Sequence, residues 1–242
     1  MLPRINPDRL TRLRVLFEDD HLLAVSKPAG IAVHGGAGET KKTVIDIVRA
    51  AYDRPADVVL AHRLDRGTSG VLLLTKGQPL AKQVRAKWDE AEKIYWAVAL
   101  GRLPKPQRIR HPLPDHEGRM QPAATRFTPL AVFDGVEPAA TLVEARLETG
   151  RTHQIRRHLK TLDHPVLIDD RHGDFAANKA WAKAVRQAGG PRPKHLMLHA
   201  RRLELPHPVT GEALAFEAAP PPQWNEVLRA AGPEVDVDGL LS

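Results

Sequence analysis

The chain has 242 residues, a formal net charge of +7 and a hydrophobic content of 42%. It contains no cysteine, which excludes a disulfide framework, a thiolate metal site and a cysteine nucleophile. The longest purely apolar runs, such as 71–74, have about four residues, whereas a membrane helix needs about 20. The first residues also lack the apolar core of a signal peptide. We therefore expect a cytoplasmic protein with its own hydrophobic core.

The charge balance suggests a nucleic-acid partner. Lysine and arginine together number 36 against 29 acidic residues, and arginine outnumbers lysine two to one. The guanidinium group suits bidentate contact with phosphate and stacking on bases, and a strongly basic domain is typical of nucleic-acid binding. A GC-rich genome would also raise the arginine content, so composition alone leaves both explanations open.

In chain order, the sequence predicts an N-terminal arm, a mixed series of strands and helices, and a flexible tail. The arm covers 1–14, the tail covers 232–242, and 102–122 is rich in proline, arginine and histidine, which predicts an irregular excursion. Apolar runs bounded by turn residues predict strands at 21–26, 58–61, 71–75, 94–100, 125–133, 141–147, 195–205 and 213–216. Apolar residues at helical spacing predict helices at 43–51, 79–91, 155–162, 175–188 and 224–228.

These elements favour the α+β class. The strands outnumber the helices and do not alternate with them regularly, which disfavours a parallel α/β fold. The sequence shows no internal repeat and no long linker. We therefore predict one catalytic domain over 15–231, built on a mixed, largely antiparallel sheet flanked by helices.

The stretch His62–Gly70 is the first candidate for chemistry. It lies between two apolar strand patterns, so a rigid sheet should hold it. It places Asp65 between Arg63 and Arg66, and nearby positive charge favours the ionised carboxylate. Such a group, held near phosphate-binding arginines, can attack or deprotonate an RNA substrate. The alternative is a surface ion pair worth about 0–1 kcal/mol.

The second candidate is Gly150–Leu159, at the start of a predicted helix. It contains Arg151, Arg156 and Arg157 together with two histidines. Because helix N-termini attract anions, this stretch suits phosphate binding. The alternative is a solvated basic helix face.

Other familiar patterns are absent. The glycine-rich stretch 35–42 lacks the Gly-Lys-Ser/Thr order of a phosphate-binding loop, and 67–70 is not a Gly-x-Ser-x-Gly elbow. His153 and His158 are five residues apart, which places them poorly on one helical face. We therefore expect no metal site. The sequence also shows no nucleophile and base in the arrangement that an unrelated hydrolase would need.

Five ordered motifs resemble those of the RluA family of pseudouridine synthases. They begin with Asp19–Gly30, and His62–Lys76 looks like the catalytic motif. The others are Lys93–Tyr95, then Arg151–Leu159 with His164–Val166, and finally Leu198–Ala200 with His207–Pro208. The resemblance covers nearly the whole chain and implies isomerisation of an RNA uridine without metal or cofactor.

The resemblance also implies residue roles. Asp65 matches the essential aspartate, which acts on a flipped-out nucleotide, and Arg156 matches the basic residue that pairs with it. Tyr95 matches the tyrosine that packs on the uracil and assists proton removal at C5. Arg63 matches the arginine that fills the gap left by the base, and Leu198 matches an apolar pocket wall. The expected RNA contacts are His62, Arg63, Arg66, Arg151, His153, Gln154, Arg157 and Leu198.

The motifs indicate the RNA target less specifically than they indicate the family. The stretches 156–160, 171–174 and 196–200 look most like the branch that modifies a T-stem uridine in tRNA. At Ile168–Asp170 the chain departs from the usual Gly-Asp, with Asp169 where we expect glycine. A large-subunit rRNA uridine is the main alternative, and a non-catalytic RNA-binding protein on the same fold is another. We expect a monomer.

Overall fold

The computed structural model describes all residues except 1–4, 7, 9, 11–12, 36–41 and 53–56. The chain forms two compact units. The first unit comprises Met1–Lys93 and Ala200–Ala218, and the second comprises Ile94–His199 and Ala219–Ser242. Strands β5 (Glu92–Leu100) and β11 (Leu198–Pro206) contribute residues to both units.

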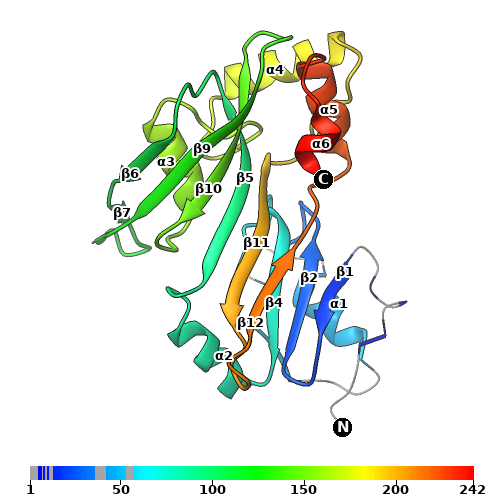
Figure 1. Ribbon diagram of the computed structural model, residues 1–242, viewed down its shortest axis with the longest axis vertical. Helices are drawn as coiled ribbons and strands as arrows, with labels where there is room; N and C mark the ends of the chain where they lie inside the picture. The colour runs from blue at the N-terminus through cyan, green and yellow to red at the C-terminus, as the bar shows by residue number, and fades with distance from the viewer. Residues whose placement is uncertain (1–4, 7, 9, 11–12, 36–41, 53–56) are drawn as a thin grey trace. The chain divides into compact units, whose positions relative to one another are not determined.

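The first unit is a sheet with two short helices. Its strands follow the order β1 (Arg14–Glu18), β2 (Leu22–Lys27), β4 (Ser69–Lys76) and β11. β3 (Val58–Leu60) pairs with β4, and β12 (Ala213–Glu217) pairs with β11 (Figure 1). The helices are α1 (Val44–Ala50) and α2 (Gln78–Ala86).

Continuous apolar runs produce the core of this unit. β4 is buried along nearly its whole length, as expected for a strand covered on both faces. Leu73 of β4 packs in one cluster with Leu22 of β2, Val84 of α2 and Phe216 of β12. The predicted helix 79–91 ends at Ala86, but its apolar residues still join this cluster.

The second unit is a sheet with four helices and a small hairpin. Its strands follow the order β5, β10 (Ala140–Leu147), β9 (Ala124–Phe133) and β6 (Gln107–Arg110). β7 (Leu113–Pro114) and β8 (Met120–Gln121) pair only with each other among the described residues. The helices are α3 (Gln154–Thr161), α4 (Phe175–Gln187), α5 (Gln223–Ala231) and α6 (Val237–Leu241).

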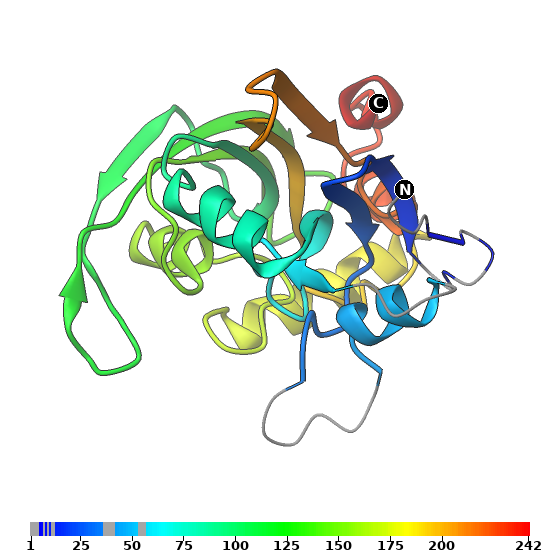
Figure 2. The ribbon, with the colours of Figure 1, turned by 90° about the horizontal axis from the view of Figure 1, so that it is seen from below.

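Two hydrophobic clusters hold this unit together. Ile155 and Leu159 of α3 pack with Phe127 and Val143, so that α3 covers one face of β9 and β10 (Figure 2). The second cluster joins α4, α5 and α6 around the fully buried Trp181. α3 is thereby fixed against the sheet along its apolar side, which leaves its basic side for other contacts.

The α+β class is confirmed, and every pairing whose register is described is antiparallel. Two expectations are wrong. The stretch 102–122 includes β6 and the β7–β8 hairpin, and the predicted tail includes α6, whose Val237 and Leu241 are buried. The local composition of both segments predicted loops. β6 is ordered because it pairs with β9, and α6 is ordered because it packs on α5. The predicted domain boundaries stay a prediction.

Gly70 tests how tightly β4 is packed. Its φ of +110° is a conformation that side chains rarely adopt, and an added Cβ would lie 2.2 Å from the carbonyl oxygen of Ala200. Gly211 has a φ of +76° but no atom within 4 Å of such a Cβ. We expect Gly211→Ala to cost about 1–2 kcal/mol through backbone strain alone, and Gly70→Ala to cost clearly more. Urea unfolding of both variants measures this, and equal losses would contradict the predicted clash.

Candidate functional site

The loop between β3 and β4 carries Asp65 in the first unit. The Thr68 amide donates to the Asp65 carbonyl at 3.1 Å, which closes a tight turn. Leu64 is buried and anchors the loop, whereas Arg63 and Arg66 are exposed and Asp65 is half-buried. The carboxylate therefore lies on a short, anchored turn flanked by two arginines.

A buried lysine stabilises this loop through hydrogen bonds to backbone carbonyls. The Nζ of Lys27 is buried and donates to the carbonyls of Pro28 and Ile31, at 2.9 Å each, and to that of Arg66 at 3.3 Å. Burial lowers the pKa of Lys27 to about 7, and the negative charge of Asp65 opposes that shift. The loop that carries Asp65 therefore accepts a hydrogen bond from an amine that changes its protonation state near neutral pH. Sequence reasoning missed this role, because the burial of Lys27 depends on tertiary packing.

His62 fixes the beginning of the same loop. Its Nε2 accepts the Leu73 amide at 3.0 Å, and its ring stacks on Trp88 with centroids 4.6 Å apart. Burial lowers the pKa of His62 to about 4, so the ring is neutral at pH 7. Through these contacts His62 stabilises the loop. The RNA contact predicted for His62 stays a prediction.

Gln154 braces the start of α3 in the second unit. Its Oε1 accepts from the Thr149 hydroxyl at 2.7 Å and from the Arg151 amide at 3.0 Å. Its Nε2 donates to the Ala124 carbonyl and the Thr125 hydroxyl, both at 2.9 Å. The side chain is only 3% exposed and its amide is fully engaged. The fold uses both polar atoms of this side chain, and the predicted RNA contact of Gln154 stays a prediction.

Arg156 forms a buried ion pair that the sequence did not reveal. Its Nε and Nη2 each donate to a carboxylate oxygen of Asp169 at 2.7 Å. Asp169 also accepts the amides of Arg171 and His172, and His172 contacts His153 through ring nitrogens 2.8 Å apart. Burial opposes ionisation of Asp169, but these hydrogen bonds hold its pKa below the ordinary value. The alternative of a solvated basic helix face does not hold for Arg156.

The turn before Asp169 corrects the position where glycine was expected. The left-handed residue is Ile168, with φ of +58°, and not Asp169. The Ile168 amide donates to Asn178 Oδ1 at 2.9 Å, which holds this conformation. Asp169 thus supplies the carboxylate, and the glycine-favouring position is one residue earlier than expected.

The remaining candidates of the second unit differ in exposure. Tyr95 is half-buried and Leu198 is buried, and both pack in the cluster that holds α3. Arg151 is exposed and its Nε donates to the Pro122 carbonyl at 3.1 Å. Among the described residues, no group of three His, Asp or Glu side chains could hold a metal ion.

The predicted site residues fall into both units. The first unit contains His62, Arg63, Asp65 and Arg66. The second contains Tyr95, Arg151, His153, Gln154, Arg156, Arg157 and Leu198.

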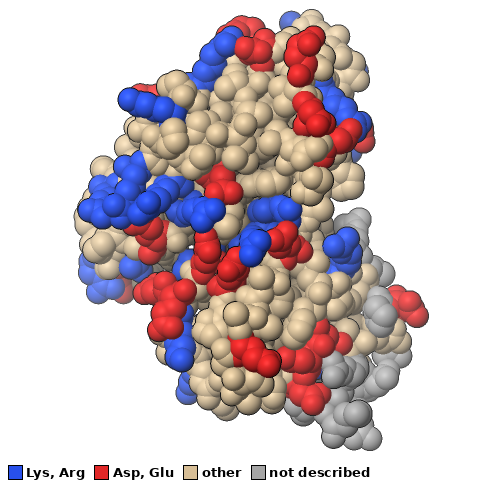
Figure 3. Space-filling model, in the orientation of Figure 1, with Lys and Arg blue, Asp and Glu red and all other residues tan. Residues whose placement is uncertain are grey.

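Much of the surface positive charge of the second unit is already paired. Figure 3 shows lysine and arginine side chains gathered over β6 and β9. There Glu148 accepts from Arg108 at 2.9 and 2.6 Å and from Arg126 at 2.8 Å, and these hydrogen bonds lower the pKa of Glu148 to about 2. This face therefore attracts phosphate less strongly than its arginines alone suggest.

The sequence matches a family model described as RNA pseudouridylate synthase over residues 21–161. It is 33% identical to a protein of Salmonella typhi named tRNA pseudouridine synthase C, over 91% of this chain and 90% of that protein. It is 35% identical to the ribosomal large subunit pseudouridine synthase C of Vibrio vulnificus, over 89% of this chain and 68% of that protein.

A solved structure shows the same architecture. The human RNA pseudouridylate synthase domain containing 4 superposes with a TM-score of 0.74 at 26% sequence identity. The match covers 93% of this chain and 94% of the human chain. The likeness therefore extends well beyond the segment matched by the family model.

The buried Lys27 predicts a pH-dependent stability. Between about pH 7 and the ordinary lysine pKa of 10.5, the folded state binds fewer protons at Lys27 than the unfolded state. Raising the pH therefore favours folding, by at most about 1.4 kcal/mol per pH unit. Relative to Lys27→Met, the wild type should gain stability from pH 7 to 10 and show a constant difference below pH 6. Urea unfolding across this range measures it, and a difference independent of pH would contradict the shift.

Proposed function

The chain belongs to the RNA pseudouridylate synthase family, and from this membership we propose that Asp65, Tyr95 and Arg156 are its catalytic residues. The protein is an isomerase that converts a uridine in RNA to pseudouridine. The observation that carries the residue proposal is the anchored turn that holds Asp65 beside two exposed arginines and above the buried Lys27.

The reaction conserves atoms and oxidation state. The N1–C1′ bond breaks, the uracil rotates, and C5 bonds to C1′. The proton on C5 is then lost, and N1 gains one from solvent. Asp65 either attacks C1′ or removes a proton from the sugar, and both routes need an ionised carboxylate. Because the chemistry needs no redox or hydrolytic step, we propose that it proceeds without metal or cofactor.

The other residues position the base and the RNA. Tyr95 lies half-buried against an apolar cluster, which suits packing on uracil, and its hydroxyl is the proposed proton acceptor for C5. The buried Arg156 is proposed to support Asp65 electrostatically. The proposed phosphate contacts are Arg63, Arg66, Arg151 and Arg157.

The proposed substrate is tRNA. Two Salmonella relatives named tRNA pseudouridine synthase C match along 90% of their length. Relatives named for the large ribosomal subunit have similar identity, 34–36%, but match along 64–68% of their length. One further relative named for tRNA matches along 65%. A large-subunit rRNA uridine is therefore the second candidate.

Location and assembly are also proposals. We propose that the enzyme acts in the cytoplasm as a monomer, where its RNA substrate is made and processed. Within the described part of the chain, no helix is long and apolar enough to cross a membrane.

Asp65→Asn should abolish turnover and keep RNA binding. The change removes the charge but keeps the size, and loss of a catalytic acid–base group costs about 10²–10⁴-fold or more. Tritium release from C5-labelled uridine in RNA measures turnover, and gel shift measures affinity. Asp57→Asn, an exposed acidic residue of the same unit, is the matched control. Substantial turnover by Asp65→Asn would disprove the assignment.

Tyr95→Phe separates the ring of Tyr95 from its hydroxyl. The ring should still pack on uracil, so RNA affinity should stay close to that of the wild type. The rate of pseudouridine formation should fall steeply. If the residue is only a core tyrosine, loss of one hydrogen bond should cost about 1 kcal/mol of stability and leave turnover intact. Turnover and thermal unfolding of the same preparation distinguish the two.

The target is tested by mapping pseudouridine in total RNA from cells with and without the gene. We expect one tRNA position to lose its pseudouridine in the deletion strain and to regain it with the wild-type gene, but not with Asp65→Asn. Loss confined to large-subunit rRNA would establish the second candidate instead.

A further inference from the structure

A groove runs along the exposed side of α3 in the second unit. It consists of two adjoining cavities, of about 390 and 690 Å³, that share Lys160 and His172. Both volumes lie within the range of small-ligand sites. We call this surface the α3 groove, and none of the proposed catalytic residues lines it.

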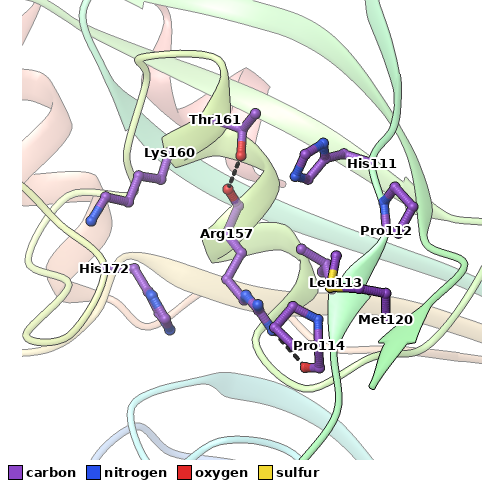
Figure 4. A pocket seen from close by; sticks show the side chains of 9 residues that line it. All are labelled: His111, Pro112, Leu113, Pro114, Met120, Arg157, Lys160, Thr161 and His172. Carbon is purple, nitrogen blue, oxygen red and sulfur yellow. Dashed lines mark hydrogen bonds between the residues drawn. The ribbon is translucent and has the colours of Figure 1, made fainter. Parts of the chain in front are cut away.

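The first cavity combines an apolar wall with positive charge. Leu113, Met120 and the prolines at positions 112 and 114 line it on the side of the β7–β8 hairpin, and Arg157 of α3 extends toward Pro114 (Figure 4). Lys160 of α3 also lines this cavity. None of the described residues that line it is acidic. Lys160 is exposed and forms no ion pair with any described residue. The cavity is therefore suited to an anion with an apolar neighbour.

The walls of this cavity are held in place by hydrogen bonds. Arg157 Nη1 donates to the Pro114 carbonyl at 3.1 Å (Figure 4). The buried ring of His158 contacts the Thr125 hydroxyl at 2.9 Å and the His111 carbonyl at 3.0 Å. These contacts tie α3 to the hairpin and to β9, so the cavity is preformed.

His172, at the junction of the two cavities, carries little of the charge. Burial, followed by the nearby charge of Arg156, lowers the pKa of His172 to about 4. Its ring nitrogen is also 2.8 Å from a ring nitrogen of His153. Because His172 is neutral at pH 7, the positive charge at the junction comes from Lys160, and Arg157 adds to it in the first cavity.

The second cavity presents an aromatic ring to solvent. Phe175, the first residue of α4, is 65% exposed. Asp174 caps the helix by accepting the Ala177 amide at 2.9 Å, which fixes the backbone that carries the ring. Asp163 also lines this cavity. The two carboxylates disfavour a phosphate here, but they can accept hydrogen bonds from the donor groups of a base.

We infer that the α3 groove binds an unpaired nucleotide of the substrate RNA outside the target uridine, with its phosphate at Lys160 and its base stacked on Phe175. This inference rests on the proposed function. Lys160, Phe175 and the two carboxylates line one cavity, so a cation for the phosphate and an aromatic ring for the base lie within the same site. Single-stranded RNA sites combine such cations and aromatic platforms.

The test uses two probes and four variants of the full chain. The probes are a fluorescent tRNA transcript that the wild type modifies and a fluorescent single-stranded RNA 10-mer. The test variants are Phe175→Ala and Lys160→Glu. Phe175→Tyr retains an aromatic ring, and Lys183→Glu makes the same charge change at an exposed position of α4. Circular dichroism confirms that each variant is folded.

Phe175→Ala should weaken binding of both probes by about 5- to 150-fold, because stacking on one base is worth about 1–3 kcal/mol. Phe175→Tyr should bind as the wild type does. Lys160→Glu should reduce the salt dependence by about 0.7 in log K per log salt, and Lys183→Glu should leave it unchanged. RNA carrying 5-iodouridine should photo-crosslink to Phe175.

The outcomes separate this inference from the proposed function. If the wild type forms pseudouridine but Phe175→Ala and Lys160→Glu bind both probes normally, the groove inference is overturned. If the groove variants lose affinity and the crosslink is found while no pseudouridine forms, the inference stands and the proposed function fails. Crosslinking of Phe175 to a copurified protein, with normal RNA binding by the variants, would assign the groove to a protein partner and also overturn the inference.

Discussion

The buried pair of Arg156 and Asp169 is the interaction on which the second unit depends most. It joins α3 to the turn before α4, 13 residues further along the chain, through two hydrogen bonds of 2.7 Å. The Asp169 side chain has no exposed surface, so removing Arg156 would leave a buried charge unpaired, at a cost of about 3–5 kcal/mol. The preceding residue, Ile168, adopts a left-handed conformation that a β-branched residue adopts only at a cost, and its amide donates to Asn178. The same turn positions His172, whose amide donates to Asp169 and whose side chain lines both cavities of the α3 groove.

Positive charge in this protein serves three different purposes. Lys27 is buried under the Asp65 turn and stabilises it through backbone carbonyls. Arg108 and Arg126 are exposed but share Glu148. Lys160 is exposed beside an aromatic ring and without an ion pair among the described residues. The net charge of +7 is therefore a poor guide to where RNA binds, because burial and pairing decide which cations remain available for phosphate.

The two units supply different parts of the proposed chemistry. The first unit holds a carboxylate on a turn braced by neutral His62 and buried Lys27. The second supplies an apolar cluster around Tyr95 and a helix whose polar residues are mostly engaged in structure. Gln154 illustrates the point, since its position in a basic motif suggested RNA contact and its hydrogen bonds instead build the start of α3.

The sequence by itself determined the α+β class, most strands, the family and the candidate Asp65, because apolar periodicity and ordered motifs are local properties of the chain. It could not show that Arg156 pairs with Asp169, that Gln154 is buried, or that 237–241 forms a packed helix. Each of these depends on which groups the folded chain brings into contact, and neither composition nor periodicity specifies those contacts. The tertiary structure also decided that Lys160 and Phe175 line one groove: their positions on separate helices carry no common motif, and only the packing of α3 beside the start of α4 brings them together.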